Sequence, residues 1–419
     1  MSETNRNLEP IDFAAWHSEL QQELNHNILG FWMDHTIDEE HGGFIGEMSN
    51  DRTTRPDAPK GLVLNARILW TFASAYRLDP QPAYKRMGER AYDALFTSFL
   101  DREHGGYYWL LDESGNPLED KKQVYGQAFV MYAYAEWHRA TGALEAMERA
   151  IDIYRWLERF AYDHKYKGYF EAKSRDWSDT DNLSLSGKDL NEKKSMNTHL
   201  HVLEAYTNLY RIWPSGELRK SLNELIEITI DHIVDPETNH FLLFFDDAWD
   251  VKSHIISYGH DIEGSWLLME AAEALQDEAL LERTKRVAIG MAEATLREGW
   301  DAEYGGIFYE AEDGRVDDEK HWWPQAEAIV GFYNAYTMTG QETYLQAAYN
   351  AWRFADQHLC DRLHGEWFWK TSRSGEPAQA HPKVDPWKCP YHNGRAMMEM
   401  IERLQHTTND AANGGEEQI

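Results

Sequence analysis

The stretch DREHGGY at residues 101–107 decides the fold, because the chain repeats its pattern six times. Each copy starts with an aspartate, continues through polar and turn-forming residues, and ends on an aromatic or aliphatic side chain. The copies lie at residues 38–44 (DEEHGGF), 101–107, 163–169 (DHKYKGY), 235–241 (DPETNHF), 301–307 (DAEYGGI) and 361–367 (DRLHGEW). Their starts are 60 to 72 residues apart, which fits two helices of about 18 residues with their connections.

The segments between the copies have helical patterns. Pro214 ends one helix, and apolar residues recur at i, i+3 and i+4 from Gly216 onward. A single helical hairpin cannot bury its apolar face alone, but six of them in a ring form an inner and an outer layer. We therefore predict an all-α fold, an (α/α)6 barrel of six helical hairpins, with short β-hairpins in the loops at one end. An open solenoid is the alternative, although it would need polar capping repeats.

The repeats occupy most of the chain. We predict one catalytic barrel domain over residues 1–406. Residues 407–419 have no apolar pattern, so we expect them to form a disordered C-terminal tail.

The composition narrows the class of partner. The chain of 419 residues has 41 Lys and Arg against 72 Asp and Glu, a net charge of −31, which disfavours nucleic acid. No apolar stretch reaches the ~20 residues of a membrane span, and there is no signal peptide pattern. The 17 Trp and 22 Tyr favour a neutral sugar, although most of them can equally fill the core. Two cysteines fit a reducing compartment, so we expect a cytoplasmic protein, a monomer or weak homodimer.

Unusual residues occur where the first helix after each copy begins, at what should be one end of the barrel. Arg67 interrupts the apolar run GLVLNARILWTF, Tyr125 lies in QVYGQAF, and HWWPQAEA contains Trp322, Trp323 and Glu327. A buried guanidinium needs a polar cavity or a carboxylate partner. Each of these residues has a purely structural alternative, so alone none of them identifies a site.

Three further repeats place histidines at the same level. Asn197 and His201 are four residues apart and share a helix face. His260 and Glu263 lie at i, i+3, so we expect the carboxylate to orient or tune the imidazole. His392 has the matching place in the last repeat. A single such histidine is commonly a core residue, but three at equivalent positions of a ring favour a site.

This arrangement suits proton transfer at carbon. The positive end of a helix disfavours imidazolium and keeps a histidine available as a base. Two histidines across a cavity can remove a proton from one face of a carbon and return it to the other. The C2 proton of a sugar aldehyde is removable if a fixed cation stabilises the enediolate, and Arg67 is placed to do so. Since no phosphate-binding loop or dinucleotide fingerprint occurs, we expect no redox cofactor.

The segments SMNTHLHVLEAY, SYGHDIEGSWLL, HWWPQAEA and DPWKCPYHNGRAM together resemble the N-acylglucosamine 2-epimerase family, over residues 15–405. The resemblance implies epimerisation of the reducing-end glucose of β-1,4-linked disaccharides, such as cellobiose or lactose, to mannose through a cis-enediol. It implies His260 and His392 as the acid and base, and His201 in ring opening. The expected substrate-binding residues are Arg67, Tyr125, Asp189, Asn197, Glu263, Trp322 or Trp323, Glu327 and Trp387.

Other functions stay open at this stage. An inverting glycoside hydrolase would need two carboxylates ~6.5 to 9.5 Å apart, and Glu263 and Glu327 are the obvious acids. A zinc enzyme would use Cys360, Cys389 and His392, although we expect no metal. A sugar-binding protein without activity would need no titrating histidine. Within the family, an N-acylglucosamine 2-epimerase or a monosaccharide aldose-ketose isomerase is the alternative.

Overall fold

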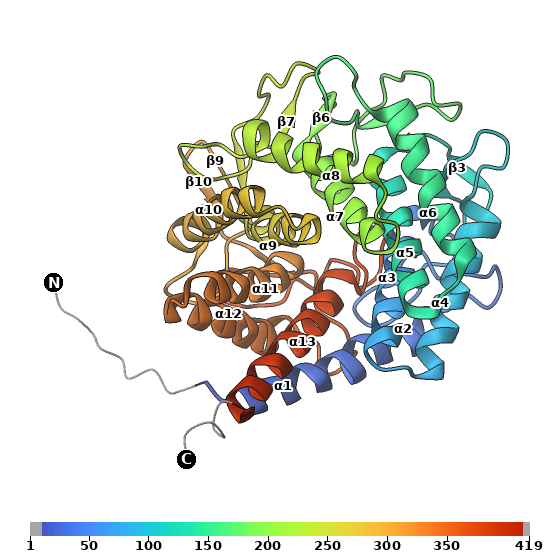
Figure 1. Cartoon of the computed structure of the whole chain (residues 1–419). Helices are drawn as coiled ribbons and strands as arrows, with labels where there is room; N and C mark the ends of the chain where they lie inside the picture. Colours follow the sequence, from blue (N-terminus) through green and yellow to red (C-terminus); the bar gives the residue numbers. More distant parts are fainter. Residues whose placement is uncertain (1–10, 414–419) are drawn as a thin grey trace.

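Six helices form a closed inner ring in the computed structural model, which describes residues 11–413 and the side chains of residues 11–405. Each inner helix contacts the next, and the last contacts the first. Arg77 on the first helix reinforces this closure by binding Glu136 and Glu402 on its two neighbours. The predicted (α/α)6 barrel is therefore confirmed (Figure 1). The inner helices are α3 (Leu62–Leu78), α5 (Val124–Thr141), α7 (Met196–Ile212), α9 (Tyr258–Leu275), α11 (Trp322–Thr339) and α13 (Tyr391–Asn413).

An outer layer of helices packs around this ring. Each outer helix buries one apolar face and continues into a short π-helical segment; in the first unit α2 follows that segment, and in the other five the next copy of the repeat does. As predicted from Pro214, α7 ends before that residue and the next helix begins at Gly216. The outer elements are α1 (Phe13–Gln22), η1 (Glu23–Leu29), α2 (Gly30–His35), α4 (Pro82–Ala94), η2 (Leu95–Phe99), α6 (Leu144–Trp156), η3 (Leu157–Ala161), α8 (Gly216–Ile228), η4 (Thr229–Ile233), α10 (Glu278–Ala294), η5 (Thr295–Gly299), α12 (Glu342–Phe354) and η6 (Ala355–Leu359).

Short antiparallel strands connect neighbouring repeats where the inner helices begin. The strand before one inner helix pairs with a strand that follows the next copy of the repeat, for example Lys60 with Leu111 and Lys122 with Lys173. The sheets are β1 (Lys60–Gly61) with β2 (Leu110–Leu111) and β3 (Pro117–Glu119); β4 (Lys122–Gln123) with β5 (Ala172–Lys173); β6 (Lys194–Ser195) with β7 (Phe244–Phe245); β8 (Ile255–Ser257) with β9 (Glu310–Glu312) and β10 (Arg315–Asp317); and β11 (Lys320–His321) with β12 (Lys370–Thr371).

The six copies of the repeat form equivalent turns. In each copy the residue before the aspartate pairs with the last residue of the copy, as Leu100 does with Tyr107. The side chain of the aspartate accepts hydrogen bonds from backbone N–H groups of the same turn, as Asp101 does from Glu103 and His104. Glycine is needed here because positions such as Gly105 and Gly106 have φ near +70°. The tight turns predicted from the repeat are thus present in all six copies.

A buried ion pair anchors five of these turns to the start of an inner helix. The second carboxylate oxygen of the aspartate accepts a hydrogen bond from a lysine, which lies two residues before the helix in four cases and farther ahead of α13 in the case of Lys383. Sequence analysis did not identify these lysines. The pairs are Asp38–Lys60, Asp101–Lys122, Asp163–Lys194, Asp301–Lys320 and Asp361–Lys383, at 2.6 to 3.0 Å.

The fourth repeat uses a different contact. Ile256 lies two residues before α9, where four of the other repeats have the lysine. In its place the imidazole of His240, inside the turn, lies 2.7 Å from a carboxylate oxygen of Asp261 on α9. Asp261 also accepts a hydrogen bond from the backbone of Phe241. The turn is therefore fixed to its inner helix by a histidine and not by a lysine.

The last helix is longer than the sequence indicates. Helix α13 continues through residues 407–413 to Asn413, past residue 406, at which we expected the domain to end. Once the preceding turns are packed, each added residue gains a backbone hydrogen bond without needing an apolar side chain. Residues 414–419 of the expected tail lie outside the described residues.

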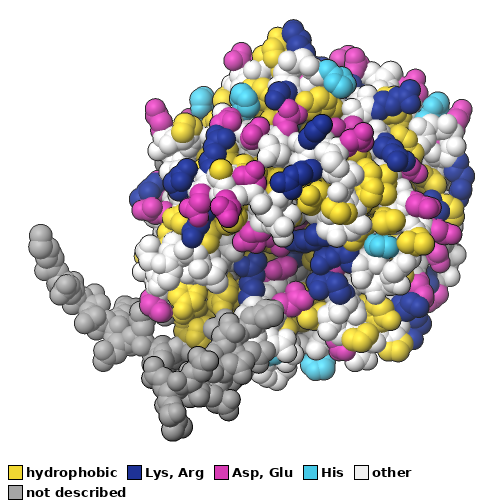
Figure 2. Space-filling view, viewed as in Figure 1, with side chains coloured by type: hydrophobic (Ala, Val, Ile, Leu, Met, Phe, Trp, Pro, Cys, Tyr) yellow, Lys and Arg dark blue, Asp and Glu magenta, His cyan; other side chains and the backbone are white. Residues whose placement is uncertain are grey.

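The surface carries charges of both signs. Figure 2 shows Lys and Arg side chains interspersed with Asp and Glu over this face, and no patch of a single sign stands out there. Within residues 11–413, no helix is long and apolar enough to cross a membrane.

We predict that Lys320→Met destabilises the fold by about 3–5 kcal/mol, because it leaves the buried carboxylate of Asp301 without its fully buried cation. Urea denaturation at pH 7 measures this free energy. Arg373→Met is the matched control, since Arg373 binds the same carboxylate but is 40% exposed. An equal loss of unfolding free energy in both variants would mean that burial does not determine how strongly a cation bound to Asp301 stabilises the fold.

Candidate active site

The starts of the inner helices converge on one end of the ring, as the repeat predicts. Each contributes a polar or aromatic side chain within its first two turns, and these side chains contact one another across the ring. The convergence brings together Arg67 on α3, Tyr125 on α5, Asn197 and His201 on α7, His260 and Glu263 on α9, Trp323 and Glu327 on α11, and His392 and Arg395 on α13.

A buried cluster of charges lies beneath this group. The guanidinium of Arg395, which is 1% exposed, lies 2.6 Å from Glu263 and 2.7 Å from Glu327, and it also binds Glu204. We call these four residues the Arg395 cluster. Its members come from α7, α9, α11 and α13, so one cation holds together four consecutive inner helices. Sequence analysis assigned no role to Arg395 and did not identify Glu204.

Glu204 orients His201. Its Oε2 atom lies 2.9 Å from Nδ1 of His201, three residues earlier on α7. The rings of Tyr125 and Phe129 flank this imidazole at 5.0 and 4.7 Å. Burial raises the pKa of Glu204, but Arg395 and then His201 outweigh it and lower that pKa to about 2. The contact with Glu204 fixes the orientation of the His201 imidazole. The i, i+3 spacing could have identified Glu204 from the sequence.

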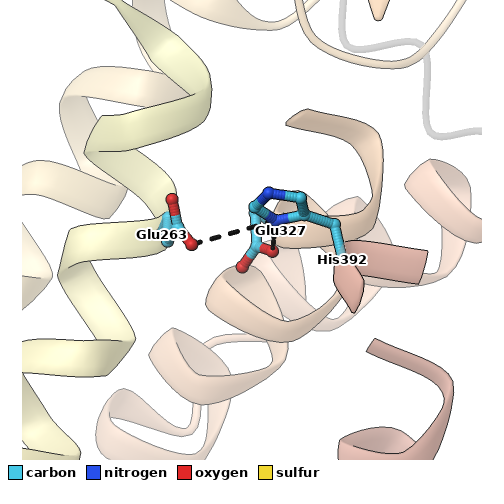
Figure 3. A group of neighbouring side chains, drawn as sticks. All are labelled: Glu263, Glu327 and His392. Carbon is cyan, nitrogen blue, oxygen red and sulfur yellow. Dashed lines mark hydrogen bonds and ion pairs between the residues drawn. The ribbon is translucent and has the colours of Figure 1, made fainter. Parts of the chain in front are cut away.

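His392 has a similar partner. Its Nδ1 atom lies 2.6 Å from Oε1 of Glu327 and 3.9 Å from Oε1 of Glu263, as the dashed lines in Figure 3 show. Burial, followed by the positive charges of Arg67 and Arg395, lowers the pKa of His392 well below its usual range. The imidazole is therefore neutral near pH 7 and able to accept a proton.

The expected partnership between His260 and Glu263 is wrong. Nδ1 of His260 lies 2.8 Å from the hydroxyl of Ser257, just before α9, while Glu263 turns toward Arg395. The reason is that a guanidinium attracts a buried carboxylate more strongly than a neutral imidazole does. Burial, then the charges of His201 and Arg67, lowers the pKa of His260 to about 3. Burial and the neighbouring Glu327 raise the pKa of Glu263 to about 7.

Arg67 supplies a fixed cation. It is 3% exposed, donates from Nη2 to the hydroxyl of Tyr125 at 2.8 Å, and lies over the rings of Phe129 and Tyr391 at 4.3 and 4.8 Å. No carboxylate lies within ion-pair distance among the described side chains, and its Nε atom has no hydrogen-bond partner there. The structural alternative of a simple Arg–carboxylate pair therefore does not hold.

The aromatic residues divide into core and cavity positions. The Trp323 ring lies 4.6 Å from His260 and 5.6 Å from His392, so it contacts both imidazoles. Trp322 is buried against Trp369 at 4.8 Å. Trp387 is partly exposed and lies 6.1 Å from the ring of Tyr125. Of the two adjacent tryptophans, Trp323 is thus the one beside the histidines.

The last two expected residues lie farther out or lack a partner. Asp189 lies in the loop between β5 and β6 and accepts a hydrogen bond from Ser186. It lines a cavity of about 660 Å³ together with Trp109, which lies 6.0 Å from Trp387. Asn197 is partly exposed, and its Oδ1 atom has no hydrogen-bond partner among the described residues. Asp189 is therefore near the aromatic edge of the site and does not contact the three histidines.

The described residues do not assemble the zinc site considered above. Among them, the His, Cys, Asp and Glu side chains close enough to share an ion are Glu263, Glu327 and His392. Neither Cys360 nor Cys389 belongs to that group, and both are free, buried thiols. Arg395 already pairs with both carboxylates, so a cation is present where a metal would bind.

The same distances argue against an inverting glycoside hydrolase. The ligand atoms of Glu263, Glu327 and His392 all lie within 4.8 Å of one another. An inverting enzyme needs its two carboxylates ~6.5 to 9.5 Å apart to admit a water molecule. These two glutamates are too close for that role because both bind one nitrogen of Arg395.

Comparison with known proteins identifies the family. The family model for N-acylglucosamine 2-epimerase matches residues 43–396. The chain belongs to this family. A cellobiose 2-epimerase of Bacteroides fragilis is 44% identical over 385 residues, 91% of this chain and 98% of that protein. One from Dictyoglomus turgidum is 38% identical over 94% of this chain and 100% of its own length.

Solved structures agree with this assignment. The structure of a cellobiose 2-epimerase from Bacillus thermoamylovorans has a TM-score of 0.89 and 37% identity, covering 93% of this chain and all of that one. Membership of the N-acylglucosamine 2-epimerase family makes this chain an isomerase that acts on carbohydrates.

We predict that Arg395→Met lowers the free energy of unfolding by about 3–5 kcal/mol at pH 7, because it leaves buried carboxylates without their cation. The difference in unfolding free energy between wild type and variant should become smaller as the pH falls. In the wild type the lowered pKa of Glu204 stabilises the fold above the unfolded pKa, and this stabilisation is lost toward pH 2. Arg395→Met removes the cation that lowers this pKa, so the variant lacks the part of the pH dependence of stability that comes from Glu204.

Urea denaturation from pH 7 down to pH 3 measures how the difference in unfolding free energy between wild type and Arg395→Met changes with pH. Arg403→Met, on a later turn of α13, is the matched control, because Arg403 is 21% exposed and binds Glu399 near the surface. A gap that widens toward acid pH would contradict the assignment of the charges in the Arg395 cluster.

Proposed function

We propose that this protein epimerises C2 of the reducing-end glucose of β-1,4-linked disaccharides such as cellobiose and lactose. The observation that carries the proposal is that His260 and His392 both lie beside the Trp323 ring, close to the fixed cation Arg67. The cellobiose 2-epimerases to which the chain is similar support the choice of substrate.

The chemistry follows from the site. Ring opening exposes the aldehyde, which makes the C2 proton removable. One of the two neutral imidazoles, His260 or His392, accepts that proton, and Arg67 stabilises the enediolate oxygen. Rotation about the C2–C3 bond then presents the other face of C2, and the second imidazole supplies the proton. Each histidine serves as base in one direction and as acid in the other.

We assign the remaining residues to binding. Tyr125 and Asn197 contact the reacting sugar, while Trp323 and Trp387 offer aromatic faces to sugar rings, and Asp189 binds the second sugar unit. Glu263 and Glu327 act through Arg395 and His392, so we place them as positioning residues. Trp322 supports Trp369 from the core.

We further propose that the ring is one catalytic domain that works without a metal or redox cofactor as a monomer or weak homodimer. The two free thiols favour a cytoplasmic location. The alternative substrate is an N-acylglucosamine, the sugar in the family's name.

The first test is incubation of chelator-treated protein with cellobiose in deuterated water, followed by proton NMR. We expect the mannose-ended disaccharide with deuterium at C2. Free glucose would indicate a hydrolase, and turnover of N-acetylglucosamine alone would favour the alternative epimerase. His260→Ala and His392→Ala should each abolish deuterium incorporation while retaining the wild-type circular dichroism. Normal exchange in either variant would remove that histidine from the acid-base pair.

We predict that Trp387→Ala raises KM for cellobiose about tenfold or more, because loss of one aromatic face removes roughly 1–3 kcal/mol of binding. The increase in KM should be smaller for a monosaccharide, because a single sugar ring offers Trp387 less surface to pack against than the two rings of the disaccharide. Steady-state kinetics with cellobiose and glucose measure the ratio. Trp213→Ala, at a distant outer turn, is the control. Equal losses for both sugars would contradict a disaccharide contact at Trp387.

A further inference from the structure

We propose that the first copy of the repeat forms a second binding site, which takes a flat aromatic ring carrying an N–H donor, such as indole. The site is a cavity of about 440 Å³ between the turn at residues 41–43 and the outer helix α4. This volume lies within the range of ~300 to 1,000 Å³ typical of small-ligand pockets. The site is independent of the proposed function, because none of the residues that line it belongs to the active site.

The second and third copies show what fills this place elsewhere in the chain. A hairpin from the following repeat carries a tryptophan at its tip, and the indole ring packs against the turn. Trp177 lies against the second turn, and its Nε1 donates to the carbonyl of His104 at 3.1 Å. Trp249 lies against the third turn and donates to the carbonyl of Tyr166 at 2.8 Å. Two equivalent turns therefore each hold an indole with its N–H bound to a turn carbonyl.

A planar side chain of the outer layer stacks on each of these indoles. The rings of Phe160 and Trp177 lie 5.3 Å apart with an interplanar angle of 20°. The rings of His232 and Trp249 lie 5.2 Å apart with an angle of 12°. In the second turn a further ring, that of Trp156 at the end of α6, lies 6.4 Å from Trp177. The indole is thus held between the turn and the rings of the outer layer.

The first turn has small residues at all three ring positions. Gly115 occupies the hairpin tip, with the hydrogen-bond pattern that surrounds Trp177. Ser98 occupies the stacking position, four residues after the end of α4, and Ala94 is the last residue of that helix. A Cβ atom on Gly115 would lie 3.7 Å from Oγ of Ser98, so the tip faces the outer helix here as in the other two turns. Small side chains in place of three rings leave the cavity.

A buried polar atom at the wall of this cavity lacks a partner. The fourth residue of α5 and of α11 is a glutamine that binds both backbone groups of the last turn residue, as Gln127 does with Tyr107. Asn65, at the same position of α3, is one methylene shorter and donates to the carbonyl of Gly61 instead. It is 1% exposed and lines the cavity, and its Oδ1 has no hydrogen-bond partner among the described residues. The first repeat thus keeps an acceptor that the others satisfy internally.

The charges around the cavity favour a neutral ligand. Helix α4 contributes two cations and two anions to its lining, namely Arg86, Glu89, Arg90 and Asp93. Lys60 also lines it and is already paired with Asp38. At the same position of the third repeat, Nζ of Lys194 lies 4.7 Å from the centre of the Trp249 ring. An aromatic ring in the cavity would therefore gain a cation–π contact with Lys60.

Isothermal titration calorimetry of the wild-type protein with indole tests the site. We expect a dissociation constant of about 1 mM or tighter, unchanged by saturating lactose. Benzofuran has the same two rings with an oxygen in place of the N–H. It should bind about fivefold more weakly, because one hydrogen bond is lost.

Variants that fill the cavity from within the chain locate the binding. Gly115→Trp supplies an indole at the tip, where Trp177 and Trp249 have φ of 67° and 73°. The variant should melt a few degrees above wild type and bind indole at least about tenfold more weakly, because its own ring occupies the cavity. Ala94→Trp fills the cavity from the end of α4, without a left-handed residue, and should weaken binding equally.

Gly115→Asn is the matched control, since asparagine tolerates the left-handed conformation but is too small to fill the cavity. Its affinity for indole should stay within about threefold of wild type. Absence of indole binding to wild type at millimolar concentration would overturn the inference. Undiminished binding in both Gly115→Trp and Ala94→Trp, or displacement of indole by lactose, would also overturn it, because the ring would then bind elsewhere. None of these measurements depends on epimerisation.

Discussion

The buried guanidinium of Arg395 is the interaction on which the rest of the site depends. It binds Glu204, Glu263 and Glu327, so α13 is tied to α7, α9 and α11 at a single point beneath the cavity. A charge without a partner at this depth would be strongly unfavourable, whereas a cation shared by three carboxylates is compensated. Glu204 and Glu327 also bind His201 and His392, and Glu263 lies 3.9 Å from His392, which links the structural cluster to the chemistry.

The cluster explains how histidines stay available as bases in a chain with many acids. Carboxylates near an imidazole normally favour its charged form. Here Arg395 compensates those carboxylates, and Arg67 adds a second positive charge above them. Burial lowers the pKa of both His260 and His392; Arg67 contributes to both shifts, and Arg395 to that of His392. The site therefore keeps neutral bases next to a cation, which is the combination needed to form and stabilise an enediolate.

The repeated turns supply the rigidity that this arrangement needs. An aspartate and a lysine, such as Asp101 and Lys122, fix five turns to the helix that carries a site residue, and His240 with Asp261 does so in the fourth. Strand pairing between neighbouring repeats connects the turns to one another. Site side chains at the helix starts are thereby held from both sides, while the catalytic residues themselves need contribute nothing to closing the ring.

The sequence by itself determined the sixfold repeat, the helical hairpins and the level at which site residues lie, because turn chemistry and helical periodicity are local properties. It also identified His201, His260 and His392 as a group. It did not determine which side chains pair: Glu263 was expected beside His260 but binds Arg395, and Glu204 was overlooked. The i, i+3 spacing was enough to find the pairing of Glu204 with His201. The pairing of Glu263 with Arg395 could be seen in the tertiary structure alone, because a carboxylate between two helices pairs with the strongest charge within reach, and local spacing does not reveal distances across the ring.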